Sequence, residues 1–377
     1  MVLSVLVFVH ELGHFLTARY FGVKAEEFGF GFPPRAVGWY HNSAGRWRRV
    51  LGNRSIESLE NSEDEKVRPA RRSTVYSINW LLLGGFVKIK GENGNGKEEK
   101  DSFVSKAIWK RVIILAAGVI MNVILAWFLF SFGYLIGMPQ SMDSLGKNAR
   151  VSDSQVAIAQ VLPESPAFYA GLKDGDSILR INDTVVNTEK EMQDLVAAES
   201  GQEVALLIGR GGEEQTIKVV PESRDDERAV IGVAIYSSGS VSYPFFSAFW
   251  EGAKTVSWML GQIFSAFGGL FKGIFQGDNI GEQFAGPVGI ATITGQAARQ
   301  GFVYLLQFVA LLSLNLAVLN ILPFPALDGG RIVFLLIEKI KGKPVRSEVE
   351  AFIHNVGFLL LIALVLFITY KDIVKAF

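Results

Sequence analysis

Long apolar stretches alternate with polar segments along the chain, and several apolar stretches are long enough to cross a membrane. A bilayer-spanning helix needs about 20 predominantly apolar residues. Four segments meet or approach this length: Met1–Phe21, Val112–Met138, Phe302–Leu322 and Val356–Tyr370. Pro323 and Pro325 stop the third segment, and the fourth is short. The pattern predicts a polytopic α-helical membrane protein with about four transmembrane helices.

Basic residues near the predicted spans indicate their orientation, because loops rich in Lys and Arg stay on the cytoplasmic side. Such residues follow the first span, precede the second and separate the third from the fourth: Arg19, Lys24, Lys106, Lys110, Arg111, Arg331, Lys339, Lys341, Lys343 and Arg346. We expect residues 22–104 and 331–350 in the cytoplasm. The N-terminus and the long segment 139–301 should face outward.

A fifth apolar segment, Thr255–Phe271, has a different composition. It is rich in glycine, contains Phe and Trp, and is preceded by Glu251 and Lys254. An additional crossing here would place the basic cluster Lys339–Arg346 on the outer side. We therefore expect an amphipathic helix in the membrane interface, within a linker at residues 237–301.

The region between the first two spans contains two kinds of polar segment. Residues 42–73 hold charges of both signs and few apolar side chains, which predicts a flexible loop. The next stretch, Ser73–Ile89, is rich in β-branched and aromatic residues around Gly84 and Gly85 and predicts a hairpin or looped strand. It is either an ordinary membrane-associated hairpin or an exposed edge that could pair with an extended peptide.

Short strand patterns within residues 155–221 predict a soluble domain. We expect strands at Val156–Val161, Ser177–Ile181, Val204–Ile208 and Thr216–Val220, and a helix at Thr188–Glu199. About 70 residues can form an independent core. The sequence therefore predicts an inserted soluble α+β domain, which we place at residues 150–236.

Composition narrows the class of protein and of metal site. The chain has 377 residues, of which 49% are hydrophobic, and its formal net charge is zero. This composition is typical of membrane proteins and indicates no nucleic-acid partner. There is no cysteine, so a metal would be held by His and carboxylate side chains. The N-terminal segment lacks a basic region and a small-residue cleavage site, which favours a retained span over a removed signal peptide.

An H-E-x-x-H motif, His10-Glu11-Leu12-Gly13-His14, lies within the first predicted span. On a helix the two histidines lie one turn apart on the same face, so both imidazoles can bind one Zn²⁺ ion. Glu11 lies beside them, placed to accept a proton from an attacking water. Ionisable groups are costly in an apolar span and mark a functional site. The motif predicts hydrolysis in or at a membrane, whereas two merely structural histidines would leave Glu11 without a role.

A third protein ligand is expected, because catalytic zinc usually has three protein ligands and one open position. Asp328 follows the broken end of the third span, where irregular backbone is tolerated if it lines a protein cavity. Asp328 could instead cap the helix expected at Arg331–Ile340. Glu26 and Glu27 are also available, although they lie close to His14 for the spacing found in soluble zinc proteases.

These motifs resemble the site-2 protease family, in particular the bacterial RseP-type intramembrane zinc metalloproteases. The resemblance rests on HELGH, on the N-x-x-P-x-P-x-L-D-G pattern at Asn320–Gly329 and on a single PDZ-like domain between them. Further similar segments are Gly29–Phe32, Gly84–Lys88, Ala116–Asn122 and Gly286–Ile290. The likeness covers nearly the whole chain.

The resemblance implies roles for individual residues. His10, His14 and Asp328 would bind zinc, and Glu11 would be the catalytic base. Residues implied to contact the substrate or the reaction intermediate are Asn320, Asn315, Asn122, Gly84 and Gly85. Gly84 and Gly85 would belong to a membrane-associated β element that engages the substrate.

The implied activity is regulated intramembrane proteolysis in the bacterial cytoplasmic (inner) membrane. The partners would be the lipid bilayer and transmembrane protein substrates already shortened by another protease, such as anti-sigma factors, or remnant signal peptides. The chain departs from the family pattern in having Val119 in place of Pro, room for one PDZ domain where many members have two, and only nine residues before His10. The missing Pro weakens the case for Asn122 as a substrate contact. A single PDZ domain puts in question the size exclusion assigned to a pair of domains. The nine residues before His10 mean that the first span is short or that its start is trimmed.

The implied organisation assigns each segment a place. The segments are residues 1–21 (first transmembrane helix with the zinc motif), 22–104 (cytoplasmic and membrane-associated region), 105–138 (second transmembrane helix), 150–236 (PDZ-like domain), 237–301 (linker), 302–345 (third transmembrane helix, LDG motif and following helix) and 346–377 (fourth transmembrane helix).

Two other functions remain open on the residues alone. A non-enzymatic metal-binding membrane scaffold could recruit partners through its PDZ domain, but it would have no use for Glu11. A soluble-facing zinc protease anchored by helices would need Glu26 or Glu27 as its third ligand.

Overall fold

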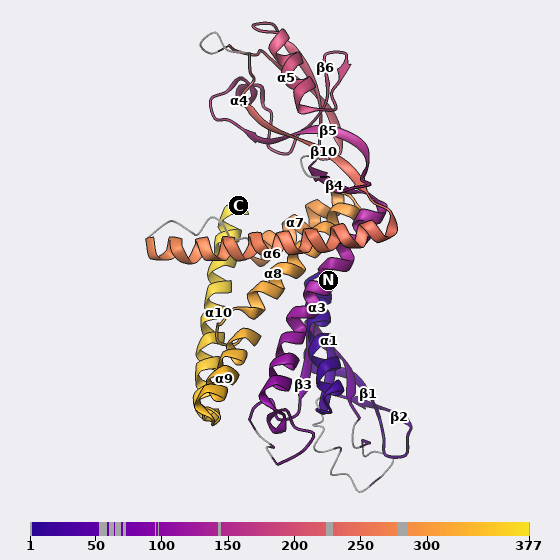
Figure 1. Cartoon of the computed structure of the whole chain (residues 1–377), viewed down its shortest axis with the longest axis vertical. Coiled ribbons are helices and arrows are strands. Elements are labelled where there is room, and N and C mark those ends of the chain that lie inside the picture. Colours follow the sequence, from indigo (N-terminus) through magenta and orange to yellow (C-terminus); the bar gives the residue numbers. More distant parts are fainter. Residues whose placement is uncertain are drawn as a thin grey trace. The chain divides into compact units, whose positions relative to one another are not determined.

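The computed structural model describes residues 2–52, 59, 64, 69–70, 73–94, 96, 98–141, 145–223, 229–276 and 286–376. Much of the loop predicted at residues 42–73 lies outside these ranges. The chain forms two compact units (Figure 1). One unit contains Met1–Trp127, Val256–Ile290 and Val309–Phe377, and the other contains Phe128–Thr255 and Ala291–Phe308.

Four helices of the described residues are long and apolar enough to cross a membrane. They are α1 (Val2–Tyr20), α3 (Ile108–Ile136), α8 (Phe302–Ile321) and α10 (Ser347–Ala376). The prediction of a membrane protein with about four transmembrane helices is confirmed. The fourth helix is longer than Val356–Tyr370, because helical polar residues flank its apolar centre at both ends.

The fifth apolar segment belongs to a long amphipathic helix, α6 (Phe245–Gln276), which is not among the candidate spans. Phe246, Trp250 and Trp258 are exposed on it. The predicted linker at residues 237–301 is more ordered than expected: it begins inside a strand and includes a second helix, α7 (Pro287–Gln300). The sequence of α7 is rich in Gly, Ala and Thr, so it carries only a weak helical pattern.

A three-stranded sheet in the first unit contains β1 (Ala25–His41), β2 (Trp47–Leu51) and β3 (Val75–Ile89), in the order β2-β1-β3. Of the two forms expected for Ser73–Ile89, the looped strand is observed: the two ends of β3, Val75–Ile78 and Gly85–Lys88, both pair with Glu27–Phe30 of β1 and not with each other as in a hairpin. Its partner strand contains two glycines and two prolines between Gly29 and Pro34, which conceal a strand pattern in the sequence.

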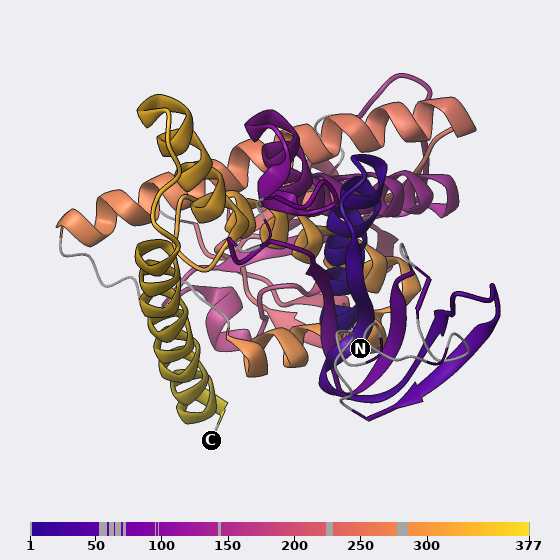
Figure 2. The ribbon, with the colours of Figure 1, turned by 90° about the horizontal axis from the view of Figure 1, so that it is seen from below.

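Helix α1 packs on β3 and β1 (Figure 2). The Ser4 hydroxyl donates a hydrogen bond to the Leu82 carbonyl at 2.8 Å. A Cβ added to Gly85 would lie 3.1 Å from the Cα of Phe8. Gly84 has a φ of +96°, a conformation that favours glycine. This glycine pair therefore lets β3 run directly beside the helix that carries the H-E-x-x-H motif.

The second unit contains the predicted inserted α+β domain. Its seven-stranded sheet has the order β4-β10-β5-β6-β8-β9, and β7 pairs with β6. The elements are β4 (Met138–Ser141), β5 (Arg150–Val161), α4 (Pro166–Ala170), β6 (Ser177–Ile181), β7 (Thr184–Val185), α5 (Glu189–Ala198), β8 (Val204–Arg210), β9 (Glu213–Val219) and β10 (Val233–Ser242). A capping box between Thr188 and Glu191 begins α5.

The core of this domain is a cluster of aliphatic side chains from both helices and from the central strands, including Ile158, Ile178, Met192 and Leu206. The four predicted strands all overlap observed ones, whereas β4, β7 and β10 were not predicted. Strand β10 continues to Ser242, so the sheet extends beyond the predicted boundary at residue 236.

Helix α9 (Asp328–Lys341) follows α8 and is held on the first unit by two arginine–carboxylate pairs. Arg111 on α3 binds Glu338 through both terminal guanidinium nitrogens, at 3.0 and 2.6 Å. Arg331 pairs with Glu92, which follows β3. A short 3₁₀ helix, η1 (Phe103–Ser105), precedes α3. Arg331 thus ties the start of α9, near Asp328, to the residues after β3, and Glu338 ties the other end of α9 to α3.

Candidate metal centre

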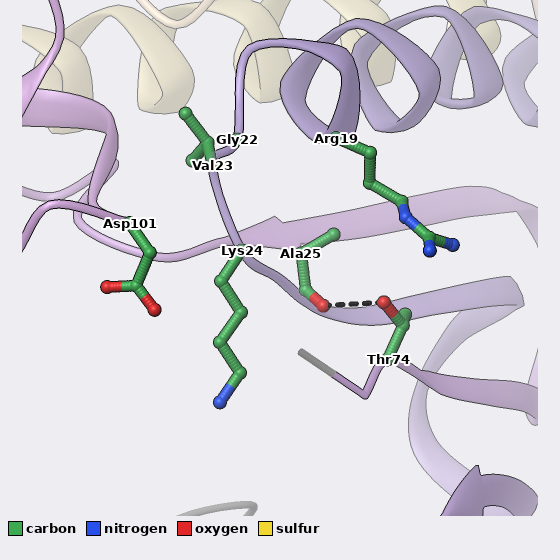
Figure 3. A pocket seen from close by; sticks show the side chains of 7 residues that line it. All are labelled: Arg19, Gly22, Val23, Lys24, Ala25, Thr74 and Asp101. Carbon is green, nitrogen blue, oxygen red and sulfur yellow. Dashed lines mark hydrogen bonds between the residues drawn. The ribbon is translucent and has the colours of Figure 1, made fainter. Parts of the chain in front are cut away.

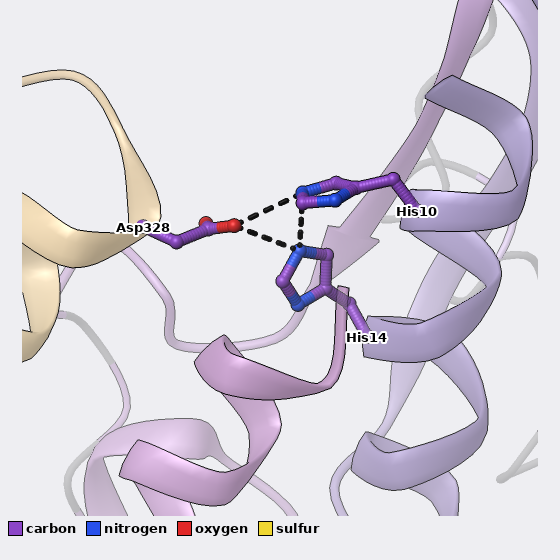
Figure 4. Close-up of side chains that lie close together, drawn as sticks. All are labelled: His10, His14 and Asp328. Atoms are coloured by element: carbon purple, nitrogen blue, oxygen red, sulfur yellow. Dashed lines mark hydrogen bonds and ion pairs between the residues drawn. The ribbon is translucent and has the colours of Figure 1, made fainter. Parts of the chain in front are cut away.

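Three side chains that could together hold a metal ion converge in the first unit (Figure 4): His10 and His14 from α1 and Asp328 from the first residue of α9. The two Nε2 atoms lie 3.1 Å apart. Asp328 Oδ2 lies 3.0 Å from His10 Nε2 and 3.3 Å from His14 Nε2. Among the described residues, this is the one group of three His or carboxylate side chains whose ligand atoms lie within 4.8 Å of one another.

The spacing of these three atoms fits a zinc ion. Zinc bonds to imidazole nitrogen and carboxylate oxygen are about 2.0–2.1 Å long, so neighbouring ligand atoms of a tetrahedral site lie about 3.3 Å apart. The observed separations of 3.0 to 3.3 Å are close to this value. Two histidines and one carboxylate would supply three protein ligands, the number found in catalytic zinc sites.

Both imidazoles have a neighbour on α3 that orients them. His14 Nδ1 donates to the Ile114 carbonyl oxygen at 2.8 Å, so its Nε2 presents a lone pair to the metal position. His10 Nδ1 lies 3.4 Å from the Asn122 amide nitrogen, and Asn122 Oδ1 has no hydrogen-bond partner among the described residues. A half-turn of this amide presents Oδ1 to an Nδ1–H of His10. The fully buried Asn122 therefore suits a His10 that binds metal through Nε2.

The crossing of α1 and α3 depends on two glycines. A Cβ added to Gly118 would lie 2.4 Å from His14 Nε2 and 2.7 Å from His10 Nε2. A Cβ on Gly13 would lie 2.3 Å from the Ala117 carbonyl oxygen. Small residues allow membrane helices to approach closely. Here they provide the space in which the two imidazoles meet.

Asp328 does not cap its helix. The N-cap position of α9 is Leu327, and no side chain caps it. Burial favours the neutral form of the Asp328 carboxyl, but hydrogen bonds and charge interactions with His10 and His14 outweigh burial and hold its pKa below the usual range. Gly329 lets the start of α9 lie close to the end of α8, since a Cβ there would lie 2.2 Å from the Ile321 and Leu322 carbonyl oxygens.

Glu11 lies beside the metal-ligating group and is held by the neighbouring strand. Its Oε2 accepts a hydrogen bond from the backbone N–H of Val87 in β3, at 3.1 Å. A donor at this position orients the carboxylate without neutralising it. The strand predicted to engage a substrate therefore contacts the residue predicted to be the base.

The alternative third ligands are engaged elsewhere. Glu26 pairs with Lys88 at 2.8 Å, and Glu27 forms a buried pair with Arg35. The structure therefore favours Asp328 over Glu26 or Glu27 as the third ligand, because these two carboxylates are paired within the β1–β3 sheet and are not part of the His10–His14–Asp328 group.

The other predicted site residues lie on elements around this centre. Asn315 and Asn320 are half-buried on α8, and Asn315 donates to the Leu311 carbonyl at 3.0 Å. Gly84 and Gly85 lie in β3 beside α1. Their roles toward a substrate stay predictions.

Several residues of the centre were not assigned from the sequence. Gly118 matters because it has no side chain, and Ile114 and Val87 act through backbone atoms. Residue type alone therefore gives little signal for any of the three. Gly118 had a partial signal, since it begins the Gly-x-x-x-Asn spacing that ends at Asn122.

A separate pocket of about 100 Å³ lies at the C-terminal end of α1 (Figure 3). Arg19, Lys24, Thr74 and Asp101 contribute to its lining, and Thr74 donates a hydrogen bond to the Ala25 carbonyl at 2.8 Å. None of the metal-ligating side chains lines it, so this pocket is distinct from the metal centre.

Comparison with known proteins agrees with this geometry. The model of peptidase family M50 matches residues 1–49 and 66–364. Zinc metalloprotease RasP of Geobacillus kaustophilus is 30% identical over 427 residues, which cover 100% of this chain and 97% of that protein. Regulator of sigma-W protease RasP of Bacillus subtilis is 31% identical over 428 residues, with the same coverage of the two chains.

Among solved structures, the PDZ domain of an SdrC-like protein from Listeria monocytogenes is 19% identical and covers 23% of this chain and 92% of that domain, with a TM-score of 0.22.

The family match extends over both histidines, the glutamate and Asp328. The chain therefore belongs to peptidase family M50, the site-2 protease family of membrane zinc metalloproteases.

Proposed function

We propose that His10, His14 and Asp328 are the zinc ligands of an intramembrane endopeptidase and that Glu11 is its general base. The observation that carries this assignment is the convergence of three ligand atoms from α1 and α9, 3.0 to 3.3 Å apart, with Glu11 on the next residue of the motif. When bound, zinc supplies the positive charge that polarises a carbonyl and makes a water acidic enough to lose a proton near neutral pH.

Residues of the chain would carry out the proton transfers and hold the ligands in place. Glu11 accepts the proton of the attacking water and later transfers it to the leaving amine. The Val87 N–H keeps the Glu11 carboxylate on the β3 side of the centre. Ile114 and Asn122 hold the two imidazoles from α3, so the ligands keep their geometry while Glu11 moves a proton.

A transmembrane substrate must unwind locally before its backbone can react, because a helix satisfies its carbonyl groups internally. Strand β3 lies at one edge of its sheet and contacts Glu11 through Val87. An extended substrate segment could pair with such an edge. We propose that Gly84 and Gly85 bring this edge to the centre, and that Asn315 and Asn320 contact the substrate from α8.

The substrates we propose are transmembrane segments that another protease has already shortened. The relative from Bacillus subtilis is named as a regulator of sigma-W protease, which suggests membrane-anchored anti-sigma factors as one substrate class. Remnant signal peptides are the other class, because they too are short membrane-spanning segments with little mass outside the bilayer. We place the chain in the bacterial cytoplasmic membrane.

We further propose that the N-terminus and the inserted domain face outward and that residues 22–104 and 331–350 are cytoplasmic. The chain has no cysteine, so single Cys substitutions can be labelled selectively in intact cells with a membrane-impermeant thiol reagent. Ser200→Cys, exposed in the inserted domain, should label in intact cells. Lys100→Cys and Ser347→Cys, both exposed, should label only after lysis. Labelling of Ser347→Cys in intact cells would mean that α6 crosses the membrane.

The inserted domain, we propose, limits access and takes no part in the chemistry, because no proposed ligand or base lies in it. Gln155 and Ser238 are register partners on β5 and β10, so a short Gly-Ser linker between them can replace residues 156–237. This variant should bind zinc and cleave a pre-truncated substrate in liposomes at the wild-type rate. It should also cleave a substrate that keeps its full outward domain, at least about tenfold faster than the intact enzyme does.

Both substrates are compared with intact and shortened enzyme in the same liposomes. Loss of activity toward both substrates by a folded, zinc-loaded variant would assign the inserted domain to the catalytic machinery. Unchanged discrimination between them would assign the size limit to another part of the chain.

A further inference from the structure

The loop between α8 and α9 carries Asp328 to the metal centre in an unusual conformation. We call residues 322–327 the proline loop, since Pro323 and Pro325 interrupt its hydrogen bonding. Ala326, two positions before Asp328, has a φ of +74°. Residues other than glycine rarely adopt this left-handed conformation unless their surroundings hold them in it.

A histidine on the last helix holds Ala326. The Nδ1 atom of His354 on α10 accepts a hydrogen bond from the Ala326 N–H at 2.8 Å. The His354 side chain is 15% exposed, and its ring lies 5.4 Å from that of Phe334. Since Nδ1 is the acceptor, the proton of the neutral ring is on Nε2, which has no hydrogen-bond partner among the described residues. The Glu350 carboxylate lies 3.9 Å from Nε2, beyond hydrogen-bond distance, so the Ala326 N–H is the hydrogen-bond partner of this ring among the described residues.

Close packing by Gly357 makes the contact possible. Gly357 lies three positions after His354, on the same face of α10. A Cβ added there would lie 2.4 Å from the Pro325 Cβ and 2.8 Å from the Pro325 carbonyl oxygen. Helix α10 thus contacts two consecutive residues of the proline loop, Pro325 and Ala326. Helix α9 also packs closely against the loop, since a Cβ on Gly330 would lie 2.3 Å from the Phe324 carbonyl oxygen.

We propose that His354 is a positioning residue of the zinc site. By accepting the Ala326 amide proton, it holds the proline loop in the conformation that brings Asp328 to His10 and His14. The action is indirect, because the hydrogen bond is made to Ala326 and not to a ligand. The inference rests on the proposed function, in which Asp328 is the third ligand.

A matched pair of substitutions isolates the hydrogen bond. In His354→Asn, the side-chain oxygen occupies about the place of Nδ1 and can still accept from Ala326. In His354→Gln, the oxygen occupies about the place of Nε2 and cannot. Both substitutions place a neutral amide side chain at position 354 of α10. Asn355→Gln, at the exposed neighbouring position, serves as a control. Zinc affinity of the full-length purified chain is measured by competition with a chelator, together with kcat, KM and the melting temperature.

We expect His354→Asn and Asn355→Gln to bind zinc within about threefold of wild type. His354→Gln should bind zinc at least about tenfold more weakly, as is typical when a residue that orients a ligand is lost. Its kcat at limiting zinc should fall in proportion, with KM unchanged. Wild-type affinity in His354→Gln, or an equal loss in His354→Asn, would overturn the proposal.

Two further variants keep the outcome interpretable. Gly357→Ala leaves His354 in place but forces α10 away from Pro325, so it should also weaken zinc binding. If His354→Gln does not fold, wild-type affinity in Gly357→Ala contradicts the proposal. Asp328→Ala in the same assay distinguishes failure of the proposed function from failure of this inference. If Asp328→Ala keeps its zinc, Asp328 is not a ligand. If Asp328→Ala loses zinc while His354→Gln binds zinc as tightly as wild type, only the role of His354 is refuted.

Discussion

Substitution of Glu11 by Gln should abolish cleavage while the protein keeps its zinc. Gln removes the group that accepts the proton from water, and general acid–base groups typically contribute about 100- to 10,000-fold to a rate. The amide is close in size to the carboxylate and can still accept from the Val87 N–H, so the packing of α1 on β3 is preserved. We expect at least about a 100-fold loss of kcat with a transmembrane peptide in detergent or liposomes, and zinc content unchanged by elemental analysis.

Glu26→Gln is a suitable control for this experiment. It removes a carboxylate that pairs with Lys88 on the same sheet but is not in the metal-ligating group. This variant should cleave at close to the wild-type rate. Substantial activity in Glu11→Gln would show that another group accepts the proton from water. Loss of zinc from Glu11→Gln would show that Glu11 contributes to metal binding.

Replacement of Gly118 by Val should remove zinc from a folded protein. The Cβ of any side chain at this position would lie 2.4 Å from His14 Nε2 and 2.7 Å from His10 Nε2, so both imidazoles must leave their present positions. We expect zinc affinity to fall at least about tenfold, by the magnitude typical for disturbed ligand orientation, and cleavage to fall with it.

The control is Gly261→Val on α6, where an added Cβ has no atom within 4 Å. That variant makes the same change within a helix and should keep both zinc and activity. Equal zinc affinity in Gly118→Val and wild type would contradict the placement of the two histidines against α3.

Much of the architecture could be predicted because local patterns determine it. The four spans are predominantly apolar segments without proline, and the central strands and α5 of the inserted domain follow short-range alternation and a capping box. His10, Glu11 and His14 could be predicted as site residues because one helical turn separates the two histidines. Asp328 could be singled out as a candidate because two prolines and two glycines surround a single carboxylate at the end of a span.

The remaining features depend on contacts between residues that are distant in sequence. Strand β1 was missed because its glycines and prolines are tolerated only when β3, some 50 residues later, pairs with it. The residues that orient the centre act through backbone atoms or through an absent side chain, as at Val87, Ile114 and Gly118. From residue types alone, Asp328 could equally have been a helix cap, and only the fold directs its carboxylate toward His10 and His14.

The most direct test of the central assignment is the zinc content of purified Asp328→Ala compared with Glu26→Ala. Asp328 supplies one of three converging ligand atoms, so its loss should leave a two-histidine site that does not retain zinc through purification. Glu26→Ala should carry the same zinc per chain as wild type. Wild-type zinc in Asp328→Ala, with zinc lost from Glu26→Ala, would contradict the proposed metal centre.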